Sequence, residues 1–506
     1  MDTIAPDMPM ARSCLGACPK VPFRYPTKQE TAVFCHKIFN KGAASDTTKT
    51  PEETDRVRSP SREETISEGK HLINNSLAST LDGRIRARSA RISVIGLGYV
   101  GLPLAMGFAK AGFCVYGLDD NADKVARIEA GEDYIRNDSA HLSELVRSQR
   151  LQAGGSYDAA ADSDVIVVCV PTPLTKNREP DVSYVSSVSK EIACRLRPGH
   201  LVVLESTTYP GTTEEILLPA LAATGLRVGV DFYLAFSPER VDPGNHDFHT
   251  LNTPKIIGGV TTECSRLTHL LYSSILEQVH VASSPRVAEM VKLLENIFRC
   301  VNIALVNELA LLSRRMDIDI WEVVRLASTK PYGFMPFYPG PGLGGHCIPI
   351  DPFYLSWKAR EFDFQTRFIE LAGEVNLQMP EHVVDIVIDA LGTHAKSLRG
   401  ARVLLLGAAY KRDVADHRES PSLKIIELLE KRGAVVDFND PLIPTITVGG
   451  RKRKSVPIDD VASYDCTVIA TDHSSYDYAS LVQCAALVVD TRNATGVRGL
   501  DHVFVL

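Results

Sequence analysis

Apolar runs of strand length alternate with helical patterns from Arg91 onward. The stretch RISVIGLGYVGLPLAMGFAKAGFCVYGLDD predicts a strand, a glycine turn, a helix and a second strand. The runs SDVIVVCV, GHLVVLES and DFYLAFSP predict three more buried strands. Strands that alternate with helices form parallel sheets covered by helices, so this pattern predicts a doubly wound α/β domain over residues 89–282.

A second alternating stretch begins at Arg402. It predicts a second Rossmann-like domain over residues 397–506, with strands in ARVLLLGAAYK, AVVDFND, DCTVIATD and AALVVDTRN. The basic run RKRK at residues 451–454 lies between two of these strands, where we expect a solvated loop. The fold class is therefore α/β, with two doubly wound parallel sheets.

A helical pattern separates the two stretches, over residues 283–396. Pro285 suits the first turn of a helix, and no glycine or proline follows for about thirty residues. One long central helix of roughly 40 Å is predicted, at 1.5 Å per residue.

Composition narrows the class of protein. Residues 1–88 are rich in Ser, Thr, Pro and charge, as in KGAASDTTKTPEETDRVRSPSREE, and are expected to be a disordered extension. The net charge of -7 argues against a broad basic surface, so no nucleic-acid or membrane partner is expected. The eleven cysteines occur singly, and no spanning segment or secretory signal stands out, so a reduced, cytoplasmic protein is predicted.

The glycine turn after the first strand carries a GxGxxG pattern. Gly96 permits a tight turn, Gly98 lets the backbone approach a pyrophosphate, and Gly101 lets helix and strand pack closely. Tyr99 and Val100 lie inside the turn and are predicted cofactor contacts with it. The alternative is a glycine-rich turn that binds no ligand.

Asp119 ends the second predicted strand. A carboxylate there hydrogen-bonds a ribose 2'-hydroxyl and repels a 2'-phosphate, which favours NAD over NADP. Lys124, one helical turn further on, is also a predicted cofactor residue, because its ammonium would offer a 2'-phosphate a partner.

Two sites carry candidate chemistry. Cys347 lies in GPGLGGHCIPIDPFYLSWKA, residues 340–359, where glycines surround a thiol and a helical run follows. It is either a cysteine that fills a gap in a tight turn, or a reactive thiol whose thiolate the helix dipole favours. Lys292 and Asn296 share a helix face among apolar neighbours, although most lysines on helices are solvated.

The order of five segments resembles the UDP-glucose/GDP-mannose dehydrogenase family. These are the GxGxxG turn, SPERVDPGN, KLLENIFRCVNIALVNEL, GPGLGGHCIPIDP and YKRDVADHRESPS, and the resemblance covers about residues 90–506. It implies NAD in the first domain and a UDP-sugar site completed by the second. The glucose branch typically reads PEFLxEG and GGxCFPKD. Here PERVDPG and GGHCIPID resemble the branch that acts on UDP-N-acetylhexosamines.

The resemblance also implies an activity and its residues. The sugar C6 alcohol would be oxidised to a carboxylate with two NAD in succession, through a thiohemiacetal and a thioester on the cysteine. The implied catalytic residues are the nucleophile Cys347, the oxyanion-stabilising Lys292 and Asn296, the acid/base or water-positioning Glu239 and Asp351, and the water-holding Thr207. The implied cofactor contacts are Thr172 and Arg418, and the implied substrate contacts are Arg240, Gly344, Lys411 and Arg492. No metal is implied.

Arg240 has two interpretations. Its guanidinium could donate to an acetamido carbonyl, or it could only pair with a neighbouring acid such as Asp242.

Other functions stay open. They are a UDP-glucose 6-dehydrogenase, a catalytically silent nucleotide-sugar sensor, and a two-electron hydroxyacid dehydrogenase that needs no Cys347 and releases one NADH per product. The resemblance and the long apolar helix also imply a homodimer or a larger homo-oligomer.

Overall fold

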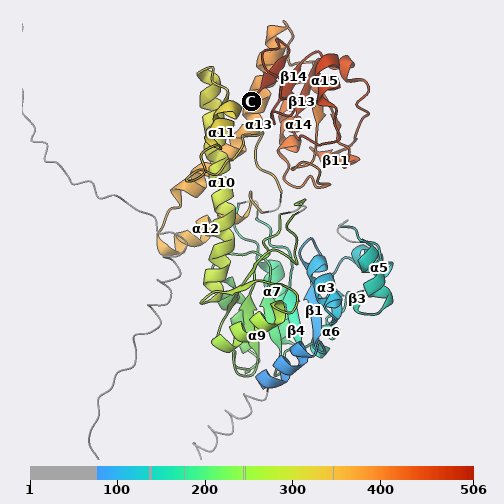
Figure 1. The fold of residues 1–506 in the computed structure, drawn as a ribbon, viewed down its shortest axis with the longest axis vertical. Coiled ribbons are helices and arrows are strands. Elements are labelled where there is room, and N and C mark those ends of the chain that lie inside the picture. The colour runs from blue at the N-terminus through green and yellow to red at the C-terminus, as the bar shows by residue number, and fades with distance from the viewer. Residues whose placement is uncertain (1–76, 136–138, 176, 243, 246, 346) are drawn as a thin grey trace, which may run out of the picture. The chain divides into compact units, whose positions relative to one another are not determined.

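The computed structural model describes residues 77–506, apart from 136–138, 176, 243, 246 and 346 (Figure 1). The predicted extension over residues 1–88 therefore lies mostly outside the described residues. For its last part the prediction is wrong, because residues 77–86 are helical. Leu81 and Ile85, four positions apart on one face of this helix, are buried in the core of the first domain. Tertiary packing, rather than a long apolar stripe, stabilises this short helix.

The first sheet has eight strands in the order β3-β2-β1-β4-β5-β6-β7-β8. All neighbouring strands are parallel except β6 and β7. The first six strands have the order of a dinucleotide-binding fold. The strands are β1 (Arg91–Ile95), β2 (Cys114–Leu118), β3 (Leu151–Gly154), β4 (Val165–Val168), β5 (Leu201–Leu204), β6 (Tyr233–Phe236), β7 (Lys255–Gly259) and β8 (Val279–Val281).

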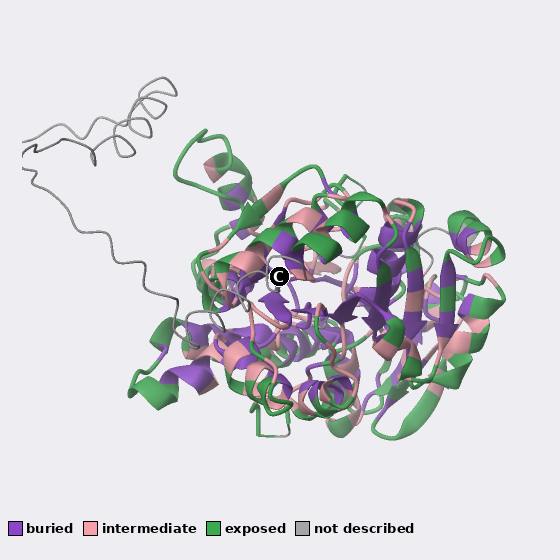
Figure 2. Ribbon diagram, turned by 90° about the horizontal axis from the view of Figure 1, so that it is seen from below, coloured by how far each residue is buried: buried purple, intermediate pink, exposed green. Residues whose placement is uncertain are grey.

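The first domain is doubly wound, as predicted. Successive residues of β4 point into different cores: Val165 and Val167 belong to one apolar cluster, and Ile166 and Val168 to another. Burial on both faces explains why these strands are continuous apolar runs; Figure 2 shows buried strands between more exposed helices. The helices are α3 (Gly101–Lys110), α4 (Ala122–Glu129), α5 (Ser139–Arg147), α6 (Asp158–Asp162), α7 (Ser183–Ala193), the π-helical turn η1 (Thr213–Leu217), α8 (Leu218–Ala222) and α9 (Thr262–Tyr272).

The predicted long helix is α10 (Pro285–Arg315). The Ser284 side chain accepts the N–H of Val287 and caps it, with Pro285 in the first turn. Helix α10 packs along α13 (Arg367–Thr393), and the two helices lie side by side in Figure 1. The other central elements are α11 (Ile320–Ala327), α12 (Asp351–Ala359) and the 3-10 turn η2 (Arg360–Phe362).

Among the described helices, α10 alone is long and apolar enough to cross a membrane by length and composition. A core helix of a soluble protein passes the same test. On this helix Lys292, Asn296 and Asn307 are buried against the rest of the chain.

The second sheet has five parallel strands in the order β10-β9-β13-β14-β15, as expected for a Rossmann-like domain. The strands are β9 (Arg402–Leu406), β10 (Val435–Asn439), β13 (Cys466–Ile469), β14 (Val488–Asp490) and β15 (Val503–Val505). The helices are α14 (Pro421–Lys431), α15 (Tyr478–Cys484) and the 3-10 turn η3 (Val461–Ser463).

The basic run at residues 451–454 is a strand rather than the predicted loop. It forms β12 (Arg451–Lys454), antiparallel to β11 (Thr445–Val448). Gly449 and Gly450 join the strands with φ of +56° and +75°, the positive values that a tight hairpin turn needs. The pair Gly449-Gly450 is therefore the feature of the sequence that indicates a hairpin here.

Candidate active site

The glycine turn between β1 and α3 has the shape that a phosphate needs. Gly96 has a φ of +93°, and a Cβ there would lie 2.6 Å from the carbonyl oxygen of Cys169. A Cβ on Gly101 would lie 1.8 Å from the carbonyl oxygen of Gly96, so packing requires both glycines. A Cβ on Gly98, in contrast, would meet no atom within 4 Å. The open space beside Gly98 and the nearby N-terminus of α3 fit a dinucleotide pyrophosphate.

Asp119, at the end of β2, is buried and organises the same turn. Its Oδ2 accepts the N–H of Leu97 at 2.8 Å, and its Oδ1 accepts the N–H of Asn121 at 3.0 Å. The Nζ of Lys124 lies 3.1 Å from Oδ2. The structure thus pairs Lys124 with the very carboxylate that is expected to exclude a 2'-phosphate.

The second Rossmann-like domain reaches this turn through Arg418. Its guanidinium lies 4.9 Å from the ring centroid of Tyr99, and Asp416 holds it from the other side at 2.7 Å. Val100 is the residue before α3 and makes no side-chain cap. Predicted cofactor residues from both domains therefore lie together at the glycine turn.

A buried polar cluster joins α10 to α12. Lys292 and Asn296 lie four positions apart on α10, and both are buried, as is Asp351, the first residue of α12. The Nδ2 of Asn296 donates to Oδ2 of Asp351 at 2.5 Å. Burial raises the pKa of Asp351 to about 6, although Lys292 and the hydrogen bond from Asn296 both lower it.

Cys347 lies beside this cluster but is not a free thiolate. Burial and the neighbouring Asp351 raise the pKa of the Cys347 thiol to about 11, against the opposing effects of Lys292, Arg299 and Arg418. That the dipole of the following helix favours the Cys347 thiolate stays a prediction; α12 begins four residues later, at Asp351. The Cys347 carbonyl oxygen accepts the N–H of Asp351 at 2.8 Å, so the carbonyl meets the helix N-terminus.

Three predicted residues follow neighbouring strands of the first sheet. Thr172 comes after β4, Thr207 after β5 and Glu239 after β6, at the carboxyl edge where such sheets bind ligands. The Thr172 hydroxyl donates to the carbonyl oxygen of Thr207 at 2.7 Å. The Tyr354 hydroxyl on α12 donates in turn to the carbonyl oxygen of Thr172. These bonds connect the edge of the sheet to the helix that begins with Asp351.

The loop before Cys347 packs against the second domain. A Cβ on Gly344 would lie 2.6 Å from Cβ of Tyr410, and one on Gly345 would lie 2.9 Å from the Tyr410 ring. These glycines therefore make room for Tyr410. A Cβ on Gly340 would similarly meet Nη1 of Arg492 at 2.6 Å.

Two predicted substrate residues of the second domain have protein partners. The Nζ of Lys411 lies 2.8 Å from Oδ2 of Asp242, and Arg299 approaches the other oxygen of that carboxylate at 3.8 Å. The Nε of Arg492 donates to the carbonyl oxygen of Ala470 at 3.0 Å. Both cations lie near the loop that carries Cys347 or near α10, and their contacts with a substrate remain predictions.

Arg240 has a partner that sequence reasoning did not name. Its Nη2 lies 2.5 Å from Oε1 of Glu295 on α10, and its Nη1 donates to the carbonyl oxygen of Pro254 at 2.7 Å. All three guanidinium nitrogens have protein partners, since Nε also donates to Glu295. The expected acid, Asp242, pairs instead with Lys411. A contact of Arg240 with an acetamido group stays a prediction that the geometry does not require.

Sequence reasoning missed a buried ion pair behind Glu239. Lys255, the first residue of β7, donates to Glu205, just after β5, at 2.7 Å. A signal was present, because each charged residue directly adjoins an apolar strand run, in PKIIGG and LVVLES. Tyr354 was missed as well, and nothing in its sequence neighbourhood marks it.

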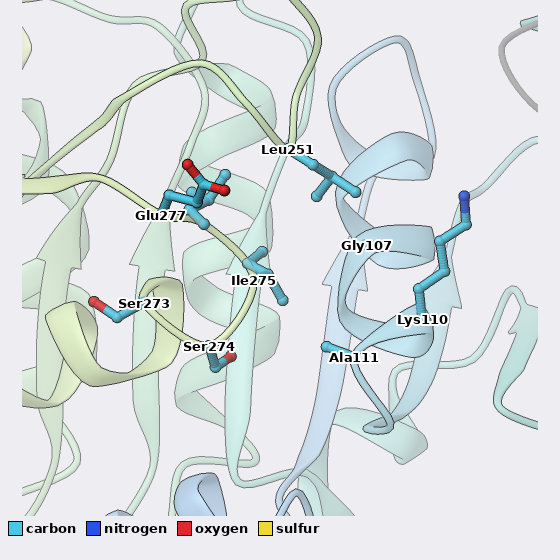
Figure 3. A pocket seen from close by; sticks show the side chains of 9 residues that line it. Gly107, Lys110, Ala111, Leu251, Ser273, Ser274, Ile275 and Glu277 are labelled. Atoms are coloured by element: carbon cyan, nitrogen blue, oxygen red, sulfur yellow. The ribbon is translucent and has the colours of Figure 1, made fainter.

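A separate open pocket of about 610 Å³ lies between the C-terminal half of α3 and the segment that follows α9 (Figure 3). Lys110 and Ala111 line it at the C-terminal end of α3, whereas the glycine turn lies at the start of that helix. Leu251 and residues 273–277 complete it. None of the predicted site residues line this pocket, so it is not part of the candidate active site.

In the described part of the chain, no three His, Cys, Asp or Glu residues gather as metal ligands would.

These features define a class of enzyme. A dinucleotide-binding turn faces the same edge of the sheet as a buried lysine, a carboxylate and a thiol, which is the arrangement of a pyridine-nucleotide dehydrogenase. Family models agree along most of the chain. The UDP-glucose/GDP-mannose dehydrogenase family matches with its NAD binding domain over residues 90–276, its central domain over 286–378 and its UDP binding domain over 404–497.

Known proteins lead to the same family. UDP-N-acetyl-D-mannosamine dehydrogenase of Pyrococcus horikoshii is 37% identical over 388 residues, which are 76% of this chain and 90% of that protein. UDP-N-acetyl-D-glucosamine 6-dehydrogenase of Pseudomonas aeruginosa is 36% identical over 394 residues, 77% of this chain and 92% of that protein. A solved structure of the UDP-D-ManNAc dehydrogenase from Pyrococcus horikoshii has a TM-score of 0.75 at 34% identity, and covers 82% of this chain and 98% of its own.

The chain therefore belongs to the UDP-glucose/GDP-mannose dehydrogenase family. It is an oxidoreductase that uses NAD and acts on a UDP-sugar.

We predict that Gly98→Ala weakens NAD binding without weakening the fold. The new methyl group would enter open space in the protein but would obstruct the cofactor, and a tenfold loss of affinity corresponds to about 1.4 kcal/mol. Titration calorimetry should find affinity for NAD at least tenfold lower, with a thermal midpoint within a few degrees of the parent. Gly101→Ala is the matched control and should lower the midpoint, because its methyl group would clash with backbone. A Gly98→Ala protein that binds NAD as tightly as the parent would contradict the assignment.

Proposed function

We propose that the enzyme oxidises the C6 alcohol of a UDP-N-acetylhexosamine, UDP-GlcNAc or UDP-ManNAc, to the carboxylate in two successive NAD-dependent steps. The observation that carries this proposal is the cluster that the partly buried Cys347 forms with the buried Asp351, Lys292 and Asn296. A two-electron dehydrogenase needs a base and a bound nicotinamide but has no use for a thiol beside them.

The first oxidation produces an aldehyde. NAD, when bound, accepts a hydride from C6 in each of the two oxidations. As the hydride leaves, the C6 hydroxyl proton passes to a carboxylate of the site, Glu239 or Asp351, which releases it to solvent before the next step. The ammonium group of Lys292 and the amide of Asn296 stabilise the negative charge that develops on the C6 oxygen.

Cys347 then captures the aldehyde. Because the thiol has a pKa of about 11, it needs a base at the moment of attack. Asp351, with a pKa of about 6, is ionised at neutral pH and can take that proton. The Sγ–C6 bond forms, and the aldehyde oxygen becomes an alkoxide held by Lys292. This adduct is the thiohemiacetal in its alkoxide form. Loss of the second hydride from C6 restores the C=O bond and leaves a thioester.

Water completes the reaction. We assign Thr207 and Glu239 to orient a water molecule toward the thioester carbonyl, with Glu239 accepting its proton. The water oxygen bonds to C6 and the Sγ–C6 bond breaks. The sulfur leaves as a thiolate that takes its proton back from Asp351, and the uronate is released. Lys411 and Arg492 from the second domain supply positive charge for the UDP moiety.

Support for an N-acetylated substrate comes from the sequence and from the relatives. The segments PERVDPG and GGHCIPID depart from the glucose-branch pattern, and relatives with 34–37% identity are named for UDP-N-acetyl-D-mannosamine or UDP-N-acetyl-D-glucosamine. Since this activity consumes a cytosolic nucleotide sugar and NAD, we assign the enzyme to the cytoplasm.

We predict that UDP-GlcNAc or UDP-ManNAc is oxidised in preference to UDP-glucose. One buried hydrogen bond to an acetamido group, worth about 1–3 kcal/mol, would give a preference of roughly 5- to 150-fold in kcat/KM. The measurement is NADH formation with each UDP-sugar at equal concentration. A parent enzyme that prefers UDP-glucose would defeat the substrate assignment, and one that produces no NADH from any UDP-sugar would defeat the enzymatic proposal.

We also propose that a second copy of the chain covers the exposed face of α10. Large apolar side chains recur there every three to seven residues, and each is at least 39% exposed: Val287, Met290, Leu294, Phe298, Leu305, Leu309, Leu312 and Met316. An apolar stripe of this length marks a protein–protein interface.

Light scattering tests this oligomer. The parent should have at least twice the mass of one chain, and Leu305→Glu/Leu309→Glu should shift the protein toward the monomer because each charge would have to be desolvated in the interface. Lys424→Glu, an exposed charge change on α14, serves as the control and should leave the mass unchanged. A parent that is monomeric at micromolar concentration would refute the proposal.

A further inference from the structure

Three charged or polar side chains form a buried network behind Glu239. Lys255 at the start of β7 and Glu205 after β5 are 3% and 1% exposed, and Tyr272 at the end of α9 is completely buried. The Nζ of Lys255 lies 2.7 Å from Oε2 of Glu205 and 3.4 Å from Oε2 of Glu239. The Tyr272 hydroxyl donates to Oε1 of Glu205.

Such a network is costly in the core of a sheet. Removing charges from water costs several kcal/mol per ion, and an apolar replacement is often neutral or stabilising. The neighbouring strand residues Leu204 and Ile257 are apolar and fully buried, so packing here does not require charge. Packing therefore does not explain why charged residues occupy these positions. Their contact with Glu239 does offer an explanation.

The carboxylate of Glu239 is held from two sides. Its Oε1 accepts the N–H groups of Arg240 and Val241, both at 2.8 Å, while its Oε2 faces Lys255. Both oxygens thus have protein partners, which restricts the side chain to one orientation. Lys292 on α10 acts on the same carboxylate electrostatically.

We propose that Lys255, held by Glu205, is a positioning residue that keeps the Glu239 carboxylate ionised and oriented beside Lys292. This inference rests on the proposed function, in which Glu239 handles protons or water. Lys255 contacts Glu205 and Glu239, and in this proposal it acts on the reaction only through Glu239.

The charges around Glu239 favour this arrangement. Burial alone would raise the pKa of Glu239, but Lys255, the two backbone N–H groups and Lys292 together hold it below its ordinary value. The carboxylate of Glu205 faces the same group and opposes this effect, whereas the thiol of Cys169, after β4, has a raised pKa and is uncharged. Burial would lower the pKa of Lys255, yet its carboxylate partners raise it to about 12, so its charge is permanent at working pH.

Removing Lys255 and removing its partner Glu205 have different consequences for the protonation of Glu239. In Lys255→Met, burial dominates and the pKa of Glu239 rises, so Glu239 becomes protonated within the working pH range. In Glu205→Gln, Lys255 keeps its charge and has one carboxylate fewer to share, so Glu239 stays ionised. Both variants remove one buried charge from the same network, which makes the second a matched control for the first.

The test is the pH profile of kcat/KM for NADH formation with the preferred UDP-sugar, which reports the pKa values of the free enzyme. In the parent and in Glu205→Gln, the acid limb should fall with a slope of one near pH 6, set by Asp351. In Lys255→Met, a second protonation should bring the slope toward two. Relative activity at pH 5 should then be several-fold lower than in the parent.

Lys255→Met leaves two buried carboxylates without their cation and can fail to fold. The double variant Lys255→Met/Glu205→Gln removes both charges of the pair, which proteins tolerate better than the loss of one partner. It also leaves Glu239 without its cation, so its acid limb should steepen in the same way.

The outcomes distinguish a failure of the role given to Lys255 from a failure of the proposed function. A folded double variant with the acid limb of the parent, at whatever rate, would show that Lys255 has only a structural role. Glu205→Gln with a steepened limb would also overturn the inference, because Lys255 would then not be the source of the effect. A parent that forms no NADH from any UDP-sugar would overturn the proposed function and this inference together.

Discussion

The buried hydrogen bond from Asn296 to Asp351 is the contact on which the rest of the site depends. It joins α10, the helix between the two Rossmann-like domains, to the first residue of α12 and thus to the loop that carries Cys347. Both side chains are buried, so losing one partner would leave an unpaired polar group at a cost of about 1–3 kcal/mol. The bond therefore favours one arrangement of thiol, carboxylate and Lys292.

The same face of α10 organises the edge of the first sheet. Glu289, one turn before Lys292, accepts the N–H groups of Gly211 and Thr213 at 2.5 and 3.0 Å, in the segment that follows β5. Glu295, beside Asn296, pairs with Arg240 and so holds the loop that follows β6. One helix thus positions segments that are far apart in the chain, which explains why it carries charged and amide groups within an apolar sequence.

Local patterns were sufficient to predict much of this architecture. The apolar runs at β1, β4 and β5 are buried on both faces, and α10 begins at a cap and a proline that are visible in the sequence. The glycine turn could also be predicted, because local packing requires Gly96 and Gly101. The strands β7 and β8 were missed because KIIGG and VHV each hold only two large apolar residues, whereas β4 and β5 are continuous apolar runs. The helix at residues 77–86 was missed because only tertiary packing marks it.

Pairings between distant side chains could not be predicted. The partner of Arg240 is 55 positions away, and Lys255 and Glu205 are separated by 50. The Cys347 thiol illustrates a different limit. The sequence indicates that a helix follows, but only the structure reveals that burial and the neighbouring Asp351 raise the pKa of the thiol.

The central claim is that a single site carries out two oxidations on one substrate carbon through Cys347. The most direct test counts the NADH formed per uronate, with a limiting amount of the preferred UDP-sugar, in the parent and in Cys347→Ala. The account predicts two NADH per uronate in the parent, and no uronate above a few per cent of the parent rate in the variant, which still binds the UDP-sugar. One NADH per product in the parent, or uronate formation at the parental rate without the thiol, would contradict it.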